Sequence, residues 1–523
     1  MNQVPTSTGP LAMSDRPGGP PARPSRRGLH LRAAVGGVLA ALAGLAVGTV
    51  AAALLGTRQT PVVAIGSAFI DRVPPWLKDL AISLFGTHDK DALRTGILIV
   101  LLALAALGGI LAVRRYAAGA AVVIALSGIA VIAAATRPDS GQTGFVPSMV
   151  AGITALLLLR LFSNRLTELH TDDGVSRRGF LQLSAGVALG TVAIGALGKV
   201  AGGHRAAVTE ARDGLDLPLP PSTEPPAGVQ APGAVPWATP NDEFYRIDTA
   251  LSVPLIMPAD WRLKIHGMVG REIELSFADL LKRPVVHKWV TLTCVSNEVG
   301  GDLIGNALWS GVLLKDLLEE AGPAKDADAI LSTSKDGFTA GTPISTLLDD
   351  RQSMLAFAMN GQPLPLEHGF PVRIVVPGLY GYVSATKWLT DIEVSRFDQF
   401  EAYWTPRGWD ELGPIKLSSR IDVPRSKATT GQVTVAGVAW DQHVGVSKVE
   451  VRVDGGPWQQ ATLAADPSTD TWRQWHWTWD APRGNHVLQV RAFDAKGNPQ
   501  VESQAPPAPN GSTGLHSVDV KVG

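Results

Sequence analysis

Five long apolar stretches occupy most of the first 202 residues, and they limit what this part of the chain can fold into. A helix needs about 20 apolar residues to cross the hydrocarbon core of a bilayer. Each stretch reaches or approaches that length. We therefore predict a transmembrane region over 33–202, with five helices at residues 33–56, 94–113, 117–136, 146–162 and 180–202.

The segments that flank these stretches have a different composition. Residues 1–32, rich in Pro, Gly, Ser and Arg, are predicted to form a disordered cytoplasmic tail. Residues 61–86 are interrupted by Asp71, Arg72 and two prolines, which favours an extracytoplasmic interfacial helix over a further span. Residues 203–240, dense in Pro, Ala and Gly, are predicted to be a semi-extended linker.

Arginines set the predicted orientation of the helices, because positively charged loops stay in the cytoplasm. They cluster before the first stretch, between the second and third, and between the fourth and fifth. These positions share one side if the N-terminus is cytoplasmic, so the chain is predicted to be a multi-pass cell-membrane protein whose C-terminal part is extracytoplasmic. The arginines are Arg23, Arg26, Arg27, Arg32, Arg114, Arg115, Arg160, Arg165, Arg177 and Arg178.

Arg177 and Arg178 also lie in SRRGFLQLSAG, which is similar to a twin-arginine export signal for folded proteins. The alternative is that they only anchor the helix on its positive side. No predicted span contains a histidine or a deeply placed acidic residue, so neither a bis-histidine haem nor an ion pathway is indicated. The formal net charge of −1 and the lack of a basic stripe argue against a nucleic-acid partner.

Two different patterns follow the linker. Residues 241–424 mix short strands and helices without βαβ regularity, which predicts an α+β domain; one of its helices is capped by Ser276 and ended by Pro284. Residues 425–523 contain short alternating strands separated by Gly, Asp and Pro turns, which predicts an immunoglobulin-like β-sandwich. The tryptophans of one strand favour packing over a sugar-binding platform: Trp472, Trp475, Trp477 and Trp479.

Cys294 is the only cysteine in the chain. One cysteine excludes an intrachain disulfide framework, Cys-rich zinc sites and cysteine-ligated iron–sulfur clusters. A single cysteine is usually a small buried hydrophobic residue. Cys294, however, comes at the end of a predicted strand, VVHKWVTLTC (285–294), where the surrounding motifs bear on its role.

Three groups of motifs occur together in the C-terminal part, and their combination is more specific than any one of them. They are VTLTCVSNEVGG (290–301) with LWSGVLLKDLLEEAG (308–322), LAFAMNGQPLPLEHGFPVRIVVPGLYG (355–381) with TKWLTDIEV (386–394), and VEVRVDGGPW (449–458) with VLQVRAFDAKGNPQ (487–500). In this order and spacing, residues from about 240 to 505 resemble the sulfite oxidase family of molybdopterin-dependent oxidoreductases. The predicted spans lie outside the resemblance.

The resemblance implies a molybdenum–molybdopterin cofactor and a role for Cys294. A molybdenum centre needs soft sulfur donors. The pterin dithiolene supplies two of them, and the family's strand-end cysteine, matched by Cys294, supplies the third. Cys294 is therefore expected to be the metal ligand and a catalytic residue.

The resemblance also implies which residues hold the cofactor. Arg373 matches a pterin-contacting arginine whose planar fork suits phosphate, and His368 matches a polar pterin contact. The alternatives are a salt bridge for Arg373 and a satisfied core histidine for His368. The loop expected to close over the pterin phosphate contains Ser384, Thr386 and Lys387. For Lys387 the alternative is again a salt bridge. The remaining expected cofactor contacts are Asn241, Tyr245, Arg246 and Thr333.

The expected reaction is a two-electron oxygen-atom transfer on a small-molecule or protein-bound oxo substrate. Animal and plant sulfite oxidases have extra arginines just after the metal-binding cysteine and a nearby tyrosine. Here Cys294 is followed by Val295, Ser296, Asn297 and Glu298, and residues 336–343 contain no tyrosine. Arg246 is then the remaining arginine expected to attract an anionic substrate. It is therefore the second predicted catalytic residue, after Cys294. Sulfite-like substrates and S- or N-oxides, including methionine sulfoxide in proteins, both stay open.

No cytochrome b5-like pattern is found, so a separate cytochrome or quinone-linked electron-transfer partner is expected. The resemblance gives the sandwich a dimerisation role, and a homodimer stays open. Two other hypotheses compete with the oxidoreductase. In one, Cys294 is a nucleophile with His287 or His368 as its base; in the other, the chain is a cofactor-free binding protein at the cell surface.

Overall fold

The computed structural model describes residues 26–55, 57, 59–72, 89–137, 143–168, 175–201, 203–228 and 230–523. Contacts divide the chain into two units, a helical one and one that holds every described strand, and each is described by itself. Residues 1–25 of the predicted tail and residues 73–86 of the predicted interfacial segment lie outside the described residues.

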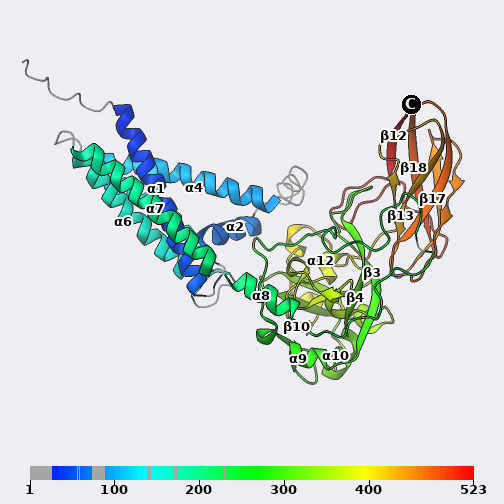
Figure 1. The fold of residues 1–523 in the computed structure, drawn as a ribbon. Helices are drawn as coiled ribbons and strands as arrows, with labels where there is room; N and C mark the ends of the chain where they lie inside the picture. Colours follow the sequence, from blue (N-terminus) through cyan, green and yellow to red (C-terminus); the bar gives the residue numbers. More distant parts are fainter. Residues whose placement is uncertain are drawn as a thin grey trace, which may run out of the picture. The chain divides into compact units, whose positions relative to one another are not determined.

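The N-terminal part of the chain is helical (Figure 1). Five of its helices contain segments long and apolar enough to cross a membrane, which confirms the five predicted apolar helices: Gly28–Leu54, Ala92–Arg114, Tyr116–Ala135, Val146–Thr167 and Gly179–Ala196. Among the described residues of this part, α2 is a further helix, and with 12 residues it is too short to be a span. The helices are α1 (Arg26–Leu54), α2 (Pro61–Arg72), α4 (Asp89–Arg114), α5 (Tyr116–Ala135), α6 (Val146–Glu168) and α7 (Val175–Ala201).

One prediction for this region needs correction. Helix α1 begins at Arg26, so the last residues of the segment 1–32 are helical rather than disordered. Residues 26–32 (RRGLHLR) contain no proline, and a helix that has formed in an apolar run propagates into such a sequence at little cost.

Small residues allow close helix packing in the helical unit. A Cβ atom added to Gly44 of α1 would lie 2.5 Å from the carbonyl oxygen of Ala151 on α6. A Cβ atom on Gly37 would overlap the backbone of α4 at Ala105. In a lipid bilayer the hydrophobic effect does not drive helices together. Helices there associate through close packing at small residues such as these glycines.

The α+β domain contains two sheets. In one, the strand order is β2-β1-β10-β5-β6, with β1 and β10 parallel; in the other it is β3-β4-β7-β8, with β9 paired to β7. The strands are β1 (Arg262–Gly267), β2 (Ile273–Ser276), β3 (Val285–Thr293), β4 (Ile304–Leu313), β5 (Ala329–Ser334), β6 (Thr339–Pro343), β7 (Met354–Met359), β8 (Gln362–Pro363), β9 (Arg373–Val375) and β10 (Leu389–Ser395). The helices are α8 (His204–Asp213), α9 (Phe277–Leu281), α10 (Leu314–Ala321), α11 (Ile344–Leu348) and α12 (Gly381–Ser384), with short 3-10 turns at Pro258–Asp260, Leu366–His368, Phe397–Gln399 and Thr405–Arg407.

Local sequence signals explain several of these elements. Ser276 accepts a hydrogen bond from the Asp279 backbone N–H, and the Asp279 carboxylate accepts one from the Ser276 backbone N–H, so a capping box starts α9. Gly322, with a φ of 67°, ends α10. Asn360 and Gly361 both have positive φ in the tight β7–β8 turn, as predicted for an Asn-Gly pair.

The C-terminal domain is a sandwich of two sheets, β11-β13-β17-β16 and β12-β19-β18-β14-β15, which confirms the immunoglobulin-like prediction. Trp472, Trp475 and Trp479 are buried, so they pack rather than form a sugar-binding surface. The strands are β11 (Ser418–Val423), β12 (Lys427–Ala428), β13 (Gly431–Trp440), β14 (Val446–Val453), β15 (Gln459–Gln460), β16 (Thr462–Leu463), β17 (Arg473–Ala481), β18 (Gly484–Asp494) and β19 (Ser517–Val522).

Two predicted boundaries differ from the structure. β11 pairs with β13, so the sandwich begins at about residue 418 rather than 425. Within the predicted linker 203–240, His204–Asp213 form α8, whose Val208 is fully buried in a cluster with Phe244. Apolar contacts to the domain therefore order a segment whose composition alone favours an extended chain.

Candidate active site

Cys294 lies immediately after β3, in the loop that leads to β4. Its backbone N–H donates to the carbonyl oxygen of Leu303 at 3.0 Å, and its side chain is buried. Burial raises the pKa of the Cys294 thiol, and the Ser296 backbone N–H, the Ser296 hydroxyl and the charge of Lys387 act in the opposite direction without reversing it. A bound metal would therefore be needed to keep the buried sulfur as a thiolate.

His368 and Asn241 form one wall of the pocket. Nε2 of His368 donates to the Asn241 carbonyl oxygen at 3.1 Å, and the Asn241 amide is bonded to Met359 and Asn360. Burial, followed by the charges of Lys387 and Arg373, lowers the pKa of His368 to about 3, so the ring is neutral. Nδ1 of His368 is buried without a hydrogen-bond partner among the described residues, and in this tautomer it is an acceptor.

Arg373, the first residue of β9, is a buried cation. Its guanidinium donates to the His368 carbonyl oxygen at 3.2 Å and lies 5.0 Å from the centre of the Trp309 ring. No carboxylate pairs with it among the described residues. Burial lowers the pKa of Arg373 to about 10, and the group stays charged at neutral pH. A buried cation without a counter-charge fits an anionic ligand.

A glycine brings the two cationic residues of the pocket together. Gly369 has a φ of 111°, and a Cβ atom there would lie 3.0 Å from the Lys387 Cβ and 3.1 Å from the Arg373 Cβ. Lys387 donates to Asp248 at 3.2 Å, and Arg246 donates to the same carboxylate oxygen at 2.9 Å. Asp248 therefore offsets the charge of Arg246, the residue expected to steer an anion.

Aromatic rings link these groups. The Phe244 ring stacks on Tyr245 at 5.2 Å between centres and meets His368 edge-on at 5.6 Å. Burial raises the pKa of the Tyr245 hydroxyl, Cys294 raises it further, and Arg373 lowers it. Tyr245 is thus near enough to the cysteine and to the buried arginine for both to affect its pKa.

Ser384, Thr386 and Thr333 are placed differently from the rest. The Ser384 hydroxyl donates to the Tyr380 carbonyl oxygen at 2.9 Å within α12, and the Thr386 hydroxyl lies 2.7 Å from that of Ser332. Because side chains alternate along a strand, Thr333 points to the opposite face of β5 from Ser332 and does not share the contact with Thr386.

Comparison with known proteins agrees with this geometry. The family described as "Oxidoreductase molybdopterin binding domain" matches residues 250–404, and "Bacterial Ig domain" matches residues 418–490. An uncharacterised oxidoreductase of Bacillus subtilis, YuiH, is 34% identical over 153 residues, which are 29% of this chain and 74% of that protein. Mitochondrial sulfite oxidase of Mus musculus is 32% identical over 338 residues. The chain belongs to the sulfite oxidase family of molybdopterin-dependent oxidoreductases.

The alignment with the sulfite oxidases covers only part of this chain and only part of each relative. The aligned region is 55% of this chain and 61% of the mouse protein, so the chain spans about three fifths of the length of the first relatives it matches. Among solved structures, the sulfane dehydrogenase SoxCD of Paracoccus pantotrophus aligns with a TM-score of 0.49 and 24% identity, over 55% of this chain and 82% of that chain.

Family membership implies a molybdenum–molybdopterin cofactor, and the pocket fits it on three observations. Cys294 is a buried sulfur donor, and among the described residues Arg373 has no carboxylate partner and Nδ1 of His368 has no hydrogen-bond partner. These groups match a metal, a phosphate and a pterin N–H, respectively.

Sequence reasoning missed several residues around this pocket. Ser296 is two residues from Cys294, but its motif gives no sign that it affects the pKa of the thiol. Trp309 contacts Arg373, from which it is distant in sequence. Asp248 contacts Arg246, which is only two residues away. Tyr380 is close enough to Cys294 for the pKa of Tyr380 to rise to about 12, mainly through burial and partly through Cys294. It lies outside residues 336–343, where a tyrosine was sought.

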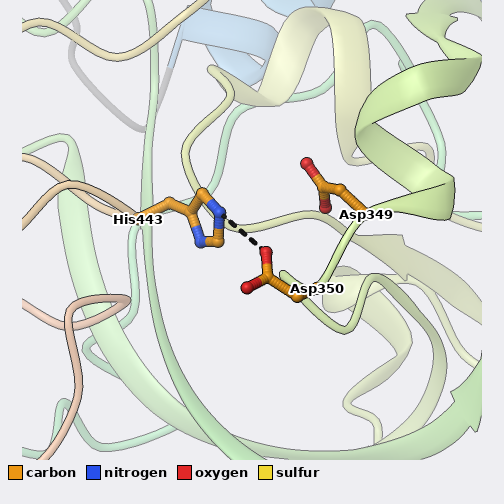
Figure 2. Close-up of side chains that lie close together, drawn as sticks. All are labelled: Asp349, Asp350 and His443. Atoms are coloured by element: carbon orange, nitrogen blue, oxygen red, sulfur yellow. Dashed lines mark ion pairs between the residues drawn. The ribbon is translucent and has the colours of Figure 1, made fainter.

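Asp349, Asp350 and His443 form a second group of metal-ligating side chains (Figure 2). Nε2 of His443 lies 3.6 Å from the Asp350 carboxylate. Arg351, however, binds both oxygens of Asp349 at 2.8 to 2.9 Å and offsets its charge. This group is therefore explained by ion pairs without a cation.

Proposed function

We propose that this chain is a membrane-anchored, molybdopterin-dependent oxidoreductase that transfers an oxygen atom outside the cytoplasm. The observation that carries the proposal is a buried sulfur donor, Cys294, and a buried cation, Arg373, within the region that matches the molybdopterin-binding family. A nucleophilic cysteine would need a base, but burial lowers the pKa of His368 to about 3 and His287 bonds to Ser310 instead.

In this proposal Cys294 is the protein's ligand to molybdenum, and the bound cofactor supplies the two-electron redox chemistry. Arg373 binds the pterin phosphate or another anionic edge, and Lys387 adds a second cation beside it. Nδ1 of His368 accepts a pterin N–H, because its Nε2 proton is committed to Asn241. Asn241 bonds to His368, and the rings of Phe244 and Trp309 pack against His368 and Arg373, so these aromatic side chains keep water from both groups.

The substrate follows from the charges that face Cys294. Val295, Ser296, Asn297 and Glu298 bring no arginine, and Asp248 offsets one of the two positive charges of Arg246 and Lys387, which both bond to it. A weakly charged oxo compound, such as an S- or N-oxide, therefore suits the pocket better than a dianion such as sulfite, although both belong to the same oxygen-atom chemistry. Turnover of sulfite with an electron acceptor, compared with reduction of methionine sulfoxide with a donor, distinguishes the two.

The extracytoplasmic location rests on the arginine distribution and on contacts within the helical unit. Arg114 at the end of α4 contacts His30 near the start of α1 at 3.2 Å, and Arg160 of α6 lies 5.8 Å from the ring of Tyr116 at the start of α5. These contacts support one common end for the basic residues, the end that the positive-inside rule assigns to the cytoplasm. Electrons would pass to or from a separate membrane or extracytoplasmic carrier.

Two measurements test the proposal. Molybdenum content of the purified full chain, compared with Cys294→Ser, tests the metal ligand; equal molybdenum and equal redox activity in both would reject it. Fusions after Gly523 test the location. A peptide tag fused there should be cleaved by a protease added to intact spheroplasts, and a tag that is cleaved only after the cells are lysed would refute an extracytoplasmic C-terminal part.

A further inference from the structure

The strand that ends at Cys294 lies at the edge of its sheet. In the order β3-β4-β7-β8, β3 is hydrogen-bonded to β4 on one side only. An edge strand presents unpaired N–H and C=O groups along its open side. The position of Cys294 therefore depends on what holds that open side, as well as on β4.

The immunoglobulin-like domain closes this edge. The Thr291 backbone N–H donates to the Asp470 carbonyl oxygen at 2.9 Å, and the Gln442 side-chain amide donates to the Thr291 carbonyl oxygen at 3.1 Å. The same Gln442 amide donates to the Thr293 hydroxyl at 2.9 Å, one residue before Cys294. Both outward-facing backbone groups of Thr291 are thus bonded to the second domain.

Charged groups strengthen the attachment. The Asp470 carboxylate bonds to Lys288 of β3 at 2.7 Å and to Nδ1 of His443 at 3.2 Å, and its side chain is only 5% exposed. His443 in turn faces Asp350 of the α+β domain (Figure 2). Asp470 therefore connects β3 to the loop that carries Gln442.

We propose that Gln442 is a positioning residue for Cys294, through which the immunoglobulin-like domain sets the direction of the metal-binding sulfur. Without the Gln442 amide, the Thr291 carbonyl and the Thr293 hydroxyl would be buried without this donor, and the end of β3 would relax toward other partners. Metal sites tolerate displacements of only about 0.5 Å. The consequence for the metal rests on the proposed function, whereas the consequence for β3 does not.

The chain offers a matched control for this test. Gln474 is also a buried glutamine of the same domain, and like Gln442 it has a side-chain oxygen without a hydrogen-bond partner among the described residues. Its amide donates to the Val235 carbonyl oxygen and not to β3. Gln442→Leu and Gln474→Leu therefore remove the same kind of bond, and only the first removes it from the cysteine strand.

The experiment compares both variants with the unmodified full chain by hydrogen exchange and by electron paramagnetic resonance of half-reduced molybdenum. We expect residues 285–294 to exchange about tenfold faster in Gln442→Leu, together with shifted molybdenum g-values. Gln474→Leu should leave both unchanged even if its thermal midpoint falls by a similar amount. Unchanged exchange and g-values in Gln442→Leu, or equal changes in both variants, would overturn the inference.

A second variant covers the case in which Gln442→Leu does not fold. Thr293→Val keeps the shape of the side chain and removes the hydroxyl that Gln442 binds, so it should reproduce the faster exchange of β3. Slow exchange in Thr293→Val would count against the positioning role. If the unmodified chain holds no molybdenum, the proposed function fails, and exchange of β3 still decides whether Gln442 holds the strand.

Discussion

The guanidinium of Arg373 lies 5.0 Å from the centre of the Trp309 ring and donates to the His368 carbonyl oxygen, and it has no carboxylate partner among the described residues. Cation–π contacts of this type stabilise a cation by about 0.5 to 2 kcal/mol. That is less than the several kcal/mol that removing an ion from water costs in a protein interior. The pocket is therefore arranged for an anion that the protein itself does not supply.

Arg373→Leu should raise the stability of the cofactor-free chain and abolish its ability to hold the cofactor. The cofactor-free form loses an uncompensated buried charge, which we expect to raise its free energy of unfolding by about 1–3 kcal/mol. The cofactor-bound form loses its phosphate partner. Thermal unfolding of the cofactor-free protein checks the predicted gain in stability. The pterin content of the purified variant checks the predicted loss of the cofactor. A lower stability of the cofactor-free variant would contradict this explanation.

His368 should make the protein sensitive to acid. Its folded pKa of about 3 lies below the unfolded value of about 6.5, so the unfolded chain binds the extra proton first. The stability contribution of the neutral ring is complete above pH 6.5 and is lost as pH falls from there toward 3. His368→Gln keeps a donor for Asn241 without titrating, and should lose about 2–3 kcal/mol less than the unmodified chain between pH 7 and pH 4.5. Parallel losses of stability in the two proteins would exclude His368 as the cause.

Ser296 should control the reactivity of the only cysteine. Ser296→Ala removes the hydroxyl hydrogen bond to the sulfur, so the pKa of Cys294 in the cofactor-free chain should rise further. Alkylation by iodoacetamide, followed as a function of pH, should shift to higher pH. Ser296→Thr keeps the hydroxyl and is the control. Identical profiles for the alanine variant and the unmodified chain would show that the Ser296 hydroxyl does not affect the thiol pKa.

Gly44 should be needed for packing of the helical unit. Gly44→Ala places a methyl group 2.5 Å from the Ala151 carbonyl oxygen, and we expect a loss of about 1–3 kcal/mol in the stability of the detergent-solubilised protein. Gly128 of α5 is a matched control, because a Cβ atom there has no neighbour within 4 Å. Gly128→Ala should be neutral or slightly stabilising. Similar thermal midpoints for the two variants would place α1 and α6 further apart than the structure has them.

Much of the fold can be predicted from local sequence, because the signals act over short distances. The apolar runs determine five helices, Ser276 determines the start of α9, and the apolar alternation before Cys294 determines β3. The cysteine could be assigned to the end of a strand for the same reason. The family motifs then supplied its chemistry, which the residue alone did not.

The remaining features depend on contacts between residues distant in sequence. α8 was missed because Val208 becomes buried only against Phe244 and its neighbours. The predicted boundary at residue 425 placed β11 in the α+β domain. Only its pairing with β13, up to 22 residues away, shows that β11 belongs to the sandwich. The face on which Thr333 lies depends on strand register, and the ion pair of Asp248 with Lys387 joins residues far apart in the chain. None of these follows from composition or motif order.

The contacts of Asn241 also constrain the order of events during synthesis. Its amide and carbonyl groups bond to Met359, Asn360 and His368, which follow it by 118, 119 and 127 residues. The ribosome must deliver residue 368 before this wall of the pocket has anything to bind, and contacts so distant along the chain form late in folding. The segment around Asn241 can therefore take its final position only after the last of these partners has been synthesised.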